Sequence, residues 1–194
     1  MKFLLSHLFL IAGMALLGGK LTAQTSEQAL PITVGYWGNL ATQPGIKVGA
    51  QLTLKDWQKE KGDKVKGRKL FVRPEIGVYN RHRNNTNLLV GAEAGIQLQR
   101  EGRKFFHSVG LGLGYLGRSQ ILSIRFSLGD GSIVGKEREW RSYILTTLNY
   151  TFGSEITSRL AWYGKASVGP ALSFTREPTT MAFLEVGLRI NLFQ

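Results

Sequence analysis

Residues 181–194 read MAFLEVGLRINLFQ, and this terminal run decides the fold. Every second position from Ala182 to Leu192 is apolar, whereas Glu185 and Arg189 are among the residues between them. Strict alternation of this kind predicts a β-strand with one apolar and one polar face. A terminal strand at the edge of a soluble domain usually frays, but this one is long and regular. We therefore expect a neighbouring strand to hold it along its whole length.

The same alternation recurs along the chain from Gly45. Seven further strands are predicted at residues 46–54, 70–79, 88–99, 105–116, 122–128, 144–152 and 160–172. The connections between them are rich in charge, Gly and Asn, and most are short, so consecutive strands should be antiparallel neighbours. No helical period of useful length follows the N-terminal segment. The sequence thus predicts an all-β, up-and-down meander of eight strands.

The N-terminal segment has the order of a secretory signal peptide. Lys2 precedes an apolar run, and small residues at 21–23 form a cleavage site, which gives a signal peptide at 1–23. An uncleaved membrane anchor is the alternative, although the run is close to the lower length limit for a spanning helix. Residues 24–44 are predicted to be an irregular lead-in that either carries a short strand or tucks against the domain. The barrel domain is then expected over 45–194.

Charge and cysteine content narrow the classes of partner and chemistry. The 194-residue chain has a net charge of +12, and without Lys2 and Lys20 it keeps 23 basic against 13 acidic residues, or +10. A basic exported protein favours anionic surfaces, of which phosphate-bearing lipid headgroups are the nearest, and no nucleic acid partner is expected. The chain has no cysteine, which excludes disulfides, thiol catalysis and a lipid-modified N-terminal cysteine.

Alternation alone does not distinguish a membrane barrel from a soluble barrel that binds an apolar ligand. The apolar face, however, carries more large side chains than the lumen of an eight-stranded barrel can hold. The opposite face is rich in Gly, which weakens a strand but suits a crowded lumen. In hydrocarbon every backbone N–H and C=O group needs a hydrogen-bond partner within the protein, so the sheet has to close and its last strand must pair with its first. We therefore predict that the apolar face points to acyl chains.

These features resemble a known family. The signal peptide, the eight alternating strands and the terminal VGLRINLFQ, residues 186–194, resemble the small eight-stranded outer-membrane β-barrel proteins of Gram-negative envelopes, over residues 45–194. The resemblance implies an antiparallel, up-and-down, eight-stranded transmembrane β-barrel in the cell outer membrane, surrounded by outer-membrane lipids and lipopolysaccharide. It also implies that the barrel assembly machinery reads the penultimate Phe193 as a terminal assembly signal.

The polar face carries charges of both signs, which we expect to pair inside the barrel as a lumen ion-pair network. The predicted members are Arg73, Glu75, Glu93, Arg125, Lys165, Glu185 and Arg189. The alternative is an acid/base site built from the three glutamates, which the arginines on the same strand faces disfavour. A lumen filled in this way is plugged, so a wide diffusion pore is not expected.

If the N-terminus lies on the periplasmic side, the connections that open at residues 58, 100, 129 and 175 are predicted to face outward. The first two, 58–68 and 100–104, carry net charges of +3 and +2, and lipopolysaccharide phosphates are natural counter-ions. A plain solvated loop is the alternative. The residues predicted to contact lipopolysaccharide are Lys59, Lys61, Lys64, Lys66, Arg68, Arg100, Arg103 and Lys104.

His107 and Ser108 are adjacent in a predicted strand and should therefore point to opposite faces, which argues against a shared catalytic site. We predict no catalytic residue, metal site or cofactor. The first functional hypothesis is a non-enzymatic outer-membrane barrel with a plugged lumen, acting as an envelope structural or interaction protein or as a subunit of a larger assembly with another membrane protein. The alternatives are a lipid-modifying barrel enzyme and a soluble exported barrel for a small apolar ligand.

Overall fold

A computed structural model describes residues 30–39, 43–61, 64–81, 85–100, 102–128, 131–173 and 177–192. Within these ranges only the backbone is described at residues 39, 59–61, 64–66, 81, 122–134, 136 and 137. The predicted signal peptide, 1–23, and the predicted assembly signal Phe193 lie outside the described residues. No helix within the described ranges is long and apolar enough to cross a membrane.

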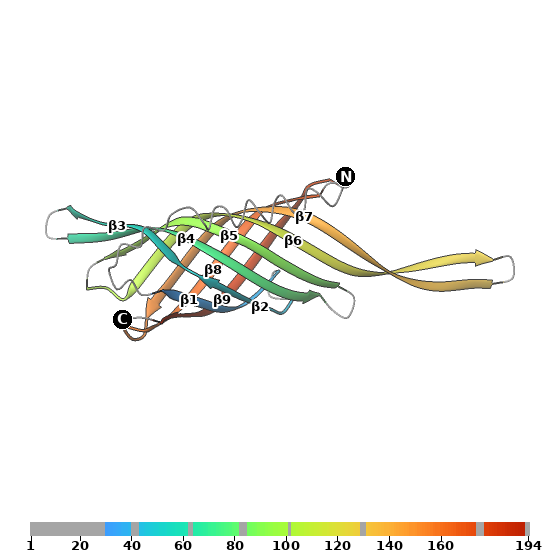
Figure 1. The fold of residues 1–194 in the computed structure, drawn as a ribbon, viewed down its shortest axis with the longest axis horizontal. Helices are drawn as coiled ribbons and strands as arrows, with labels where there is room; N and C mark the ends of the chain where they lie inside the picture. The colour runs from blue at the N-terminus through green and yellow to red at the C-terminus, as the bar shows by residue number, and fades with distance from the viewer. Residues whose placement is uncertain are drawn as a thin grey trace.

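The described chain forms one antiparallel sheet that closes into a barrel (Figure 1). β2 and β3 are successive lengths of one strand, separated by Gln51, and both pair with β4, so the barrel has eight strands. β1 closes it by pairing with β9 on one side and with β2 on the other. The elements are β1 (Pro31–Asn39), β2 (Gly45–Ala50), β3 (Leu52–Lys61), β4 (Lys64–Arg81), β5 (Asn85–Arg100), β6 (Phe105–Leu128), β7 (Gly131–Glu155), β8 (Leu160–Ser173) and β9 (Thr179–Asn191).

One strand assignment made from the sequence is wrong and another was left open, and the two compensate in the strand count. The lead-in, predicted either to carry a short strand or to tuck against the domain, carries strand β1, so the last strand pairs with β1 and not with 46–54. The predicted strands 105–116 and 122–128 are parts of one strand, β6. Gly117 and Ser119 do not form a turn, because both continue the ladder with β5 on one side and β7 on the other.

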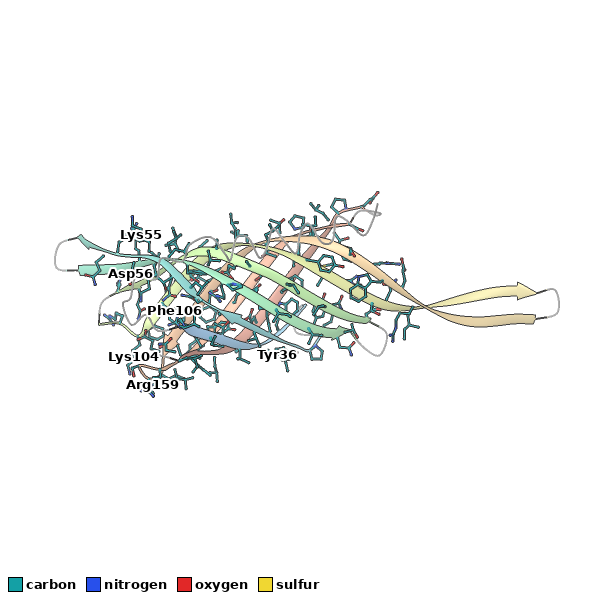
Figure 2. All side chains as sticks on the ribbon, in the orientation of Figure 1. Tyr36, Lys55, Asp56, Lys104, Phe106 and Arg159 are labelled. Carbon is teal, nitrogen blue, oxygen red and sulfur yellow. The ribbon has the colours of Figure 1, made fainter. Side chains whose placement is uncertain are left out.

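The two ends of the barrel carry different connections. We call the end at which Pro31 and Asn191 lie the termini end; the strand ends that flank 62–63, 101–104 and 156–159 lie there too. We call the opposite end, where β6 and β7 extend past the barrel as a two-stranded ribbon, the ribbon end. The strand ends that flank 40–44, 82–84, 129–130 and 174–178 lie there. Backbone bonds from Glu155 N to the Lys104 carbonyl, 2.9 Å, and from Leu192 N to the Leu30 carbonyl, 3.3 Å, join neighbours at the termini end. Figure 2 shows Lys55 and Asp56 at the same end as Lys104 and Arg159.

The four connections predicted to face outward therefore do not share one end. Those that open at 58 and 100 lie at the termini end, and those that open at 129 and 175 lie at the ribbon end. The prediction failed because the assumed turn at 117–119 reversed the direction of every strand predicted after it. Strand β1, which was not counted, also places Pro31 at the same end as the first two connections.

β6 and β7 continue past the barrel as a two-stranded ribbon, residues 121–138, which extends to the right in Figure 1. Pairing of β5 with β6 ends at Asn85 and Gln120, and pairing of β7 with β8 begins at Tyr143. Within the described chain, the ribbon strands consequently pair only with each other. Arg125 pairs with Val134 inside the ribbon, so its predicted place in the lumen network is wrong.

The apolar face points outward and the polar face inward, as the sequence predicts. On β9, Val186 is 63% exposed, whereas the adjacent Glu185 is 3% exposed. The outward row of β6 runs from Phe105 to Tyr115, about 34 Å of strand, or about 25 Å of membrane at a tilt of about 40°. This outward apolar belt contradicts the alternative of a soluble exported barrel.

Candidate functional site: the barrel lumen

Five charged side chains, one from each of five strands, form an ion-pair layer in the middle of the lumen. Lys47 Nζ lies 3.1 Å from Glu75 Oε2 and 2.5 Å from Glu185 Oε2. Lys165 Nζ lies 3.2 Å from the same Glu75 oxygen and also pairs with Glu93. Glu75 thus bridges the two lysines, and the layer links β2, β4, β5, β8 and β9 across the barrel axis.

The layer is tightly enclosed by its neighbours. Glu93 is fully buried, and Lys165 is its one ion-pair partner among the described residues. Gly110 faces the Glu93 carboxylate, and a Cβ at that position would lie 2.8 Å from Glu93 Oε1. The glycine therefore makes the space that this carboxylate occupies. On the other side of the layer, the Tyr163 hydroxyl donates a hydrogen bond of 2.5 Å to Glu185 Oε1.

A second layer, toward the termini end, joins two arginines through two amides; we call it the amide layer. Arg73 Nη2 donates to Gln51 Oε1 at 3.4 Å, and Gln51 Nε2 donates to Gln97 Oε1 at 3.2 Å. Arg189 Nη1 donates to the same Gln97 oxygen at 3.1 Å. The Arg189 guanidinium also lies 4.1 Å from the centroid of the Phe106 ring, a cation–π distance. These contacts hold two cations in the lumen without a direct carboxylate partner within the described chain.

A third layer, toward the ribbon end, is aromatic. Trp37 stacks on Phe183 with ring centroids 5.2 Å apart and meets Tyr79 edge-on at 4.8 Å. Lys47 Nζ lies 5.6 Å from the Trp37 ring, so this aromatic layer rests on the ion-pair layer. A cavity of about 20 Å³ beside them has room for about one water. The buried cluster around the three rings also contains Leu89, Leu116, Tyr143, Leu145, Ala171 and Met181.

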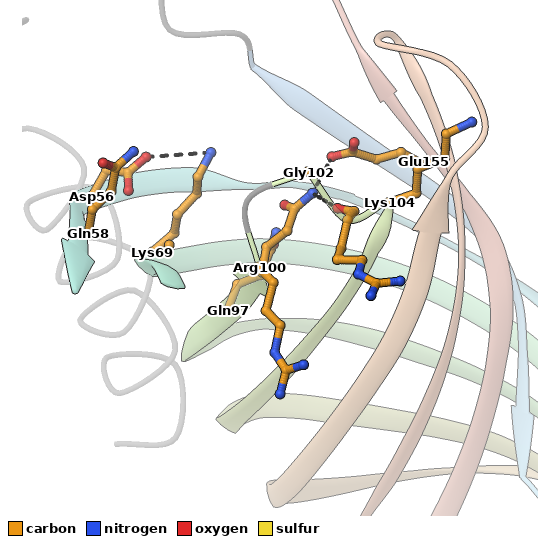
Figure 3. Close-up of a pocket in the computed structure, with 11 residues that line it drawn as sticks. Asp56, Gln58, Lys69, Gln97, Arg100, Gly102, Lys104 and Glu155 are labelled. Atoms are coloured by element: carbon orange, nitrogen blue, oxygen red, sulfur yellow. Dashed lines mark hydrogen bonds and ion pairs between the residues drawn. The ribbon is translucent and has the colours of Figure 1, made fainter. Parts of the chain in front are cut away.

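At the termini end the lumen opens into a polar pocket of about 350 Å³ (Figure 3). The Asp56 carboxylate lies 3.5 Å from Lys69 Nζ on one wall. On the other wall Gln99 Nε2 donates to Glu155 Oε1 at 2.9 Å. Gln97 of the amide layer also lines this pocket, so the pocket ends where the packed lumen begins.

Six of the predicted lumen residues lie in these layers. Four of them, Glu75, Glu93, Lys165 and Glu185, are in the ion-pair layer, while Arg73 and Arg189 are in the amide layer. The sequence reasoning missed Lys47, Gln51, Gln97 and Tyr163. The alternation could have predicted the inward position of all four, because each stands an even number of positions from another inward-facing residue of its strand.

The residues predicted to contact lipopolysaccharide all belong to strands or connections at the termini end. Arg68 lies in β4 and Arg100 ends β5, while Arg103 and Lys104 follow in the next connection. Lys59 and Lys61 in β3, and Lys64 and Lys66 in β4, are described by backbone only.

The described residues place no metal-binding cluster beside the lumen layers. His107 is exposed on the outer face and Ser108 is buried on the inner face, so the pair is divided by the barrel wall as expected. Within the described ranges no group of three or more His, Asp or Glu side chains is placed to hold a metal ion. The charged residues of the ion-pair layer instead pair with one another, and the two arginines of the amide layer bond glutamine side chains.

Comparison with solved structures shows the class of proteins whose fold this chain shares. The crystal structure of neisserial surface protein A aligns with 84% of this chain and 94% of that chain, at 10% identity and a TM-score of 0.53. The N-terminal β-barrel domain of Pseudomonas aeruginosa OprF aligns over 84% and 98%, at 15% identity and a TM-score of 0.41, too low for comparison in detail. No family model and no curated protein matches the chain. The chain thus has the fold of the eight-stranded β-barrels of Gram-negative outer membranes.

Proposed function

We propose that this protein is an integral outer-membrane barrel with a closed lumen, which serves the envelope as a structural or interaction protein. The observation that carries the proposal is the stack of three layers across the lumen. Aromatic rings, a buried ion-pair layer and an arginine–amide layer follow one another along the axis. Such a lumen leaves no continuous path for a hydrated solute, because buried side chains from several strands fill its cross-section at each layer.

Conductance in planar lipid bilayers tests the closed lumen. The folded wild-type protein should give no stable ionic current and should leave liposomes impermeable to small sugars. The double variant Lys165→Ala, Glu93→Ala removes one ion pair without leaving an unpaired charge, and should admit water and small ions. A stable wild-type current equal to that of the variant would refute the closed lumen. The heat-denatured protein serves as the control for leakage around misfolded chains.

We further propose that the termini end faces the periplasm and the ribbon faces the cell exterior. Outer-membrane barrels carry short periplasmic turns and longer extracellular extensions, and the ribbon is an extension of that kind. Both of its strands pair only with each other within the described residues. A two-stranded ribbon alone is marginally stable in water, so contact with another envelope component would stabilise it.

The absence of native cysteine makes the orientation directly testable with single-cysteine variants. A membrane-impermeant maleimide should label Arg138→Cys at the ribbon base in intact cells. It should label Arg159→Cys, which is exposed at the termini end, only after the envelope is permeabilised. The reverse pattern would refute the orientation. Cross-linking from Arg138→Cys in whole cells, compared with Arg159→Cys, would then identify a protein that contacts the ribbon.

A further inference from the structure

A second cavity lies on the outside of the barrel wall at the termini end, where β5 ends and β6 begins. It has a volume of about 640 Å³, within the range of small-molecule sites, and its lining is mostly apolar. Leu98 and Phe105 belong to the outward apolar rows and are 45% and 63% exposed. The rest of the lining is Gly67, Gln99, Arg100, Arg103 and His107, and all of these except His107 also line the polar pocket at the end of the lumen.

The rim of this cavity is cationic and is held in place by a defined turn. Arg103 N donates to the Arg100 carbonyl at 3.0 Å, and Gly102 between them has a φ of 70°, which glycine adopts without strain. Gln99 Nε2 bonds both the Arg103 carbonyl, at 3.2 Å, and Glu155. The turn is thus tied to the barrel wall, and Figure 3 shows the Arg100 side chain pointing away from Glu155.

The charges on the rim are available to a ligand. Both arginines are exposed, and no ion pair formed by the described residues involves either guanidinium. Arg100 follows Leu98 in the outward row of β5 and so lies about 7 Å further along the strand, toward the membrane surface. His107 and Tyr150 add a polar pair beside them, with Nδ1 and Oη 2.9 Å apart. An apolar surface that ends in cations at its edge matches a lipid with an anionic headgroup.

We propose that this cavity binds one anionic phospholipid of the periplasmic leaflet. Arg100 and Arg103 bind the headgroup phosphate by charge-assisted hydrogen bonds, and Leu98 and Phe105 contact the acyl chains. The choice of leaflet rests on the proposed orientation, which puts the termini end in the periplasm. Lipopolysaccharide has the same phosphate chemistry but occupies the opposite leaflet. We therefore propose that Arg100 and Arg103, which the sequence predicts to contact lipopolysaccharide, contact the phosphate of a phospholipid instead.

The test uses the folded full barrel in detergent, stripped of lipid and titrated with phosphatidylglycerol, with bound lipid counted by native mass spectrometry. The wild type should retain one phosphatidylglycerol in preference to phosphatidylcholine. The variant Arg100→Gln, Arg103→Gln should bind it at least about tenfold more weakly. The matched control, Lys104→Gln, Arg159→Gln, removes the same charge from the same end outside the cavity and should bind as the wild type does. Heat-modifiable migration verifies that every variant is folded.

Each alternative outcome overturns the proposal in a different way. Equal loss in the matched control would show a diffuse attraction to the basic end and no defined site. Unchanged binding in Arg100→Gln, Arg103→Gln would refute the site, and displacement of phosphatidylglycerol by purified lipopolysaccharide at lower concentration would show that lipopolysaccharide, and not a phospholipid, is the preferred ligand. Failure of the orientation is detected separately, by maleimide labelling of Arg159→Cys in intact cells, and failure of the closed lumen by a wild-type current.

Discussion

Replacing Lys165 by methionine should destabilise the barrel more than neutralising Glu75 in the same ion-pair layer. Lys165 is the one ion-pair partner of the fully buried Glu93 within the described chain. Lys165→Met keeps the length of the side chain but leaves the Glu93 charge buried and unpaired. Removing one partner of a buried pair typically costs about 3–5 kcal/mol. We expect the free energy of unfolding of Lys165→Met to fall by that amount.

Two further variants separate charge from packing. In Glu75→Gln each lysine keeps one carboxylate, because Lys47 retains Glu185 and Lys165 retains Glu93, so the loss should stay below about 2 kcal/mol. In the double variant Lys165→Met, Glu93→Gln neither member is charged. Stability should then recover relative to the single variant, with an interaction energy of about 2 kcal/mol between the two sites.

These differences in the free energy of unfolding are measured by equilibrium unfolding in urea. The protein is reconstituted in lipid vesicles, and unfolding is followed by tryptophan fluorescence. The denaturant slope should be unchanged, which shows that the folded barrel buries the same surface in every variant. If Lys165→Met were no less stable than Glu75→Gln, Lys165 would not be the essential counter-charge of Glu93. If the double variant lost the sum of the losses measured for Lys165→Met alone and for Glu93→Gln alone, the contact between Lys165 and Glu93 would carry no energy.

Three further predictions use heat-modifiable migration or the same unfolding assay. Gly187→Ala should weaken the β1–β9 seam, because its Cβ would lie 2.6 Å from the Gly35 Cα, whereas Gly67→Ala, with 3.4 Å to its nearest atom, should fold normally; equal heat-modifiable bands would refute this. Leu113→Arg on the lipid face should cost about 2–4 kcal/mol, and Ser119→Arg, beyond the aromatic Tyr115, no more than about 1 kcal/mol. Replacing residues 122–137 with Asn-Gly should leave the urea midpoint unchanged, because the ribbon pairs only with itself in the described chain; a lower midpoint would show that it supports the barrel.

The sequence predicted the faces of the strands and their total of eight better than the residues at which they begin and end. Alternation depends only on the period of two, so the outward position of Val186 and the inward position of Glu185 follow directly from it. Strand ends depend on where the chain reverses, and Gly117 and Ser119 are turn formers by propensity alone. In the folded barrel they lie between two partners, and the ladder overrides that propensity. The sequence left open whether the lead-in carries a strand, because Pro31 and Pro44 indicate a loop when read locally.

The sequence predicted that the lumen contains ion pairs, but it did not predict which residues pair with each other. Glutamates and arginines on the inward face indicate ion pairs, but the partner of each depends on the stagger between strands. Glu93 and Lys165, for example, meet across the barrel although β5 and β8 are not neighbours in the sheet. Lys47 was on the correct face in the sequence pattern. It was omitted because nothing local shows that β2 brings it between Glu75 and Glu185.

The ion-pair layer also has a consequence for the register of the strands. A sheet with an apolar exterior and an apolar lumen would lose little on slipping by one residue, because either face would suit the membrane. Here a slip of β9 by one position would turn Glu185 and Arg189 toward acyl chains and bring Val186 and Leu188 into the charged lumen. Each charge exposed to lipid near the membrane centre costs about 2–4 kcal/mol. The buried charges therefore stabilise the correct register relative to the slipped one, even where their own contribution to folding is small, and the seam between β1 and β9 closes in one way.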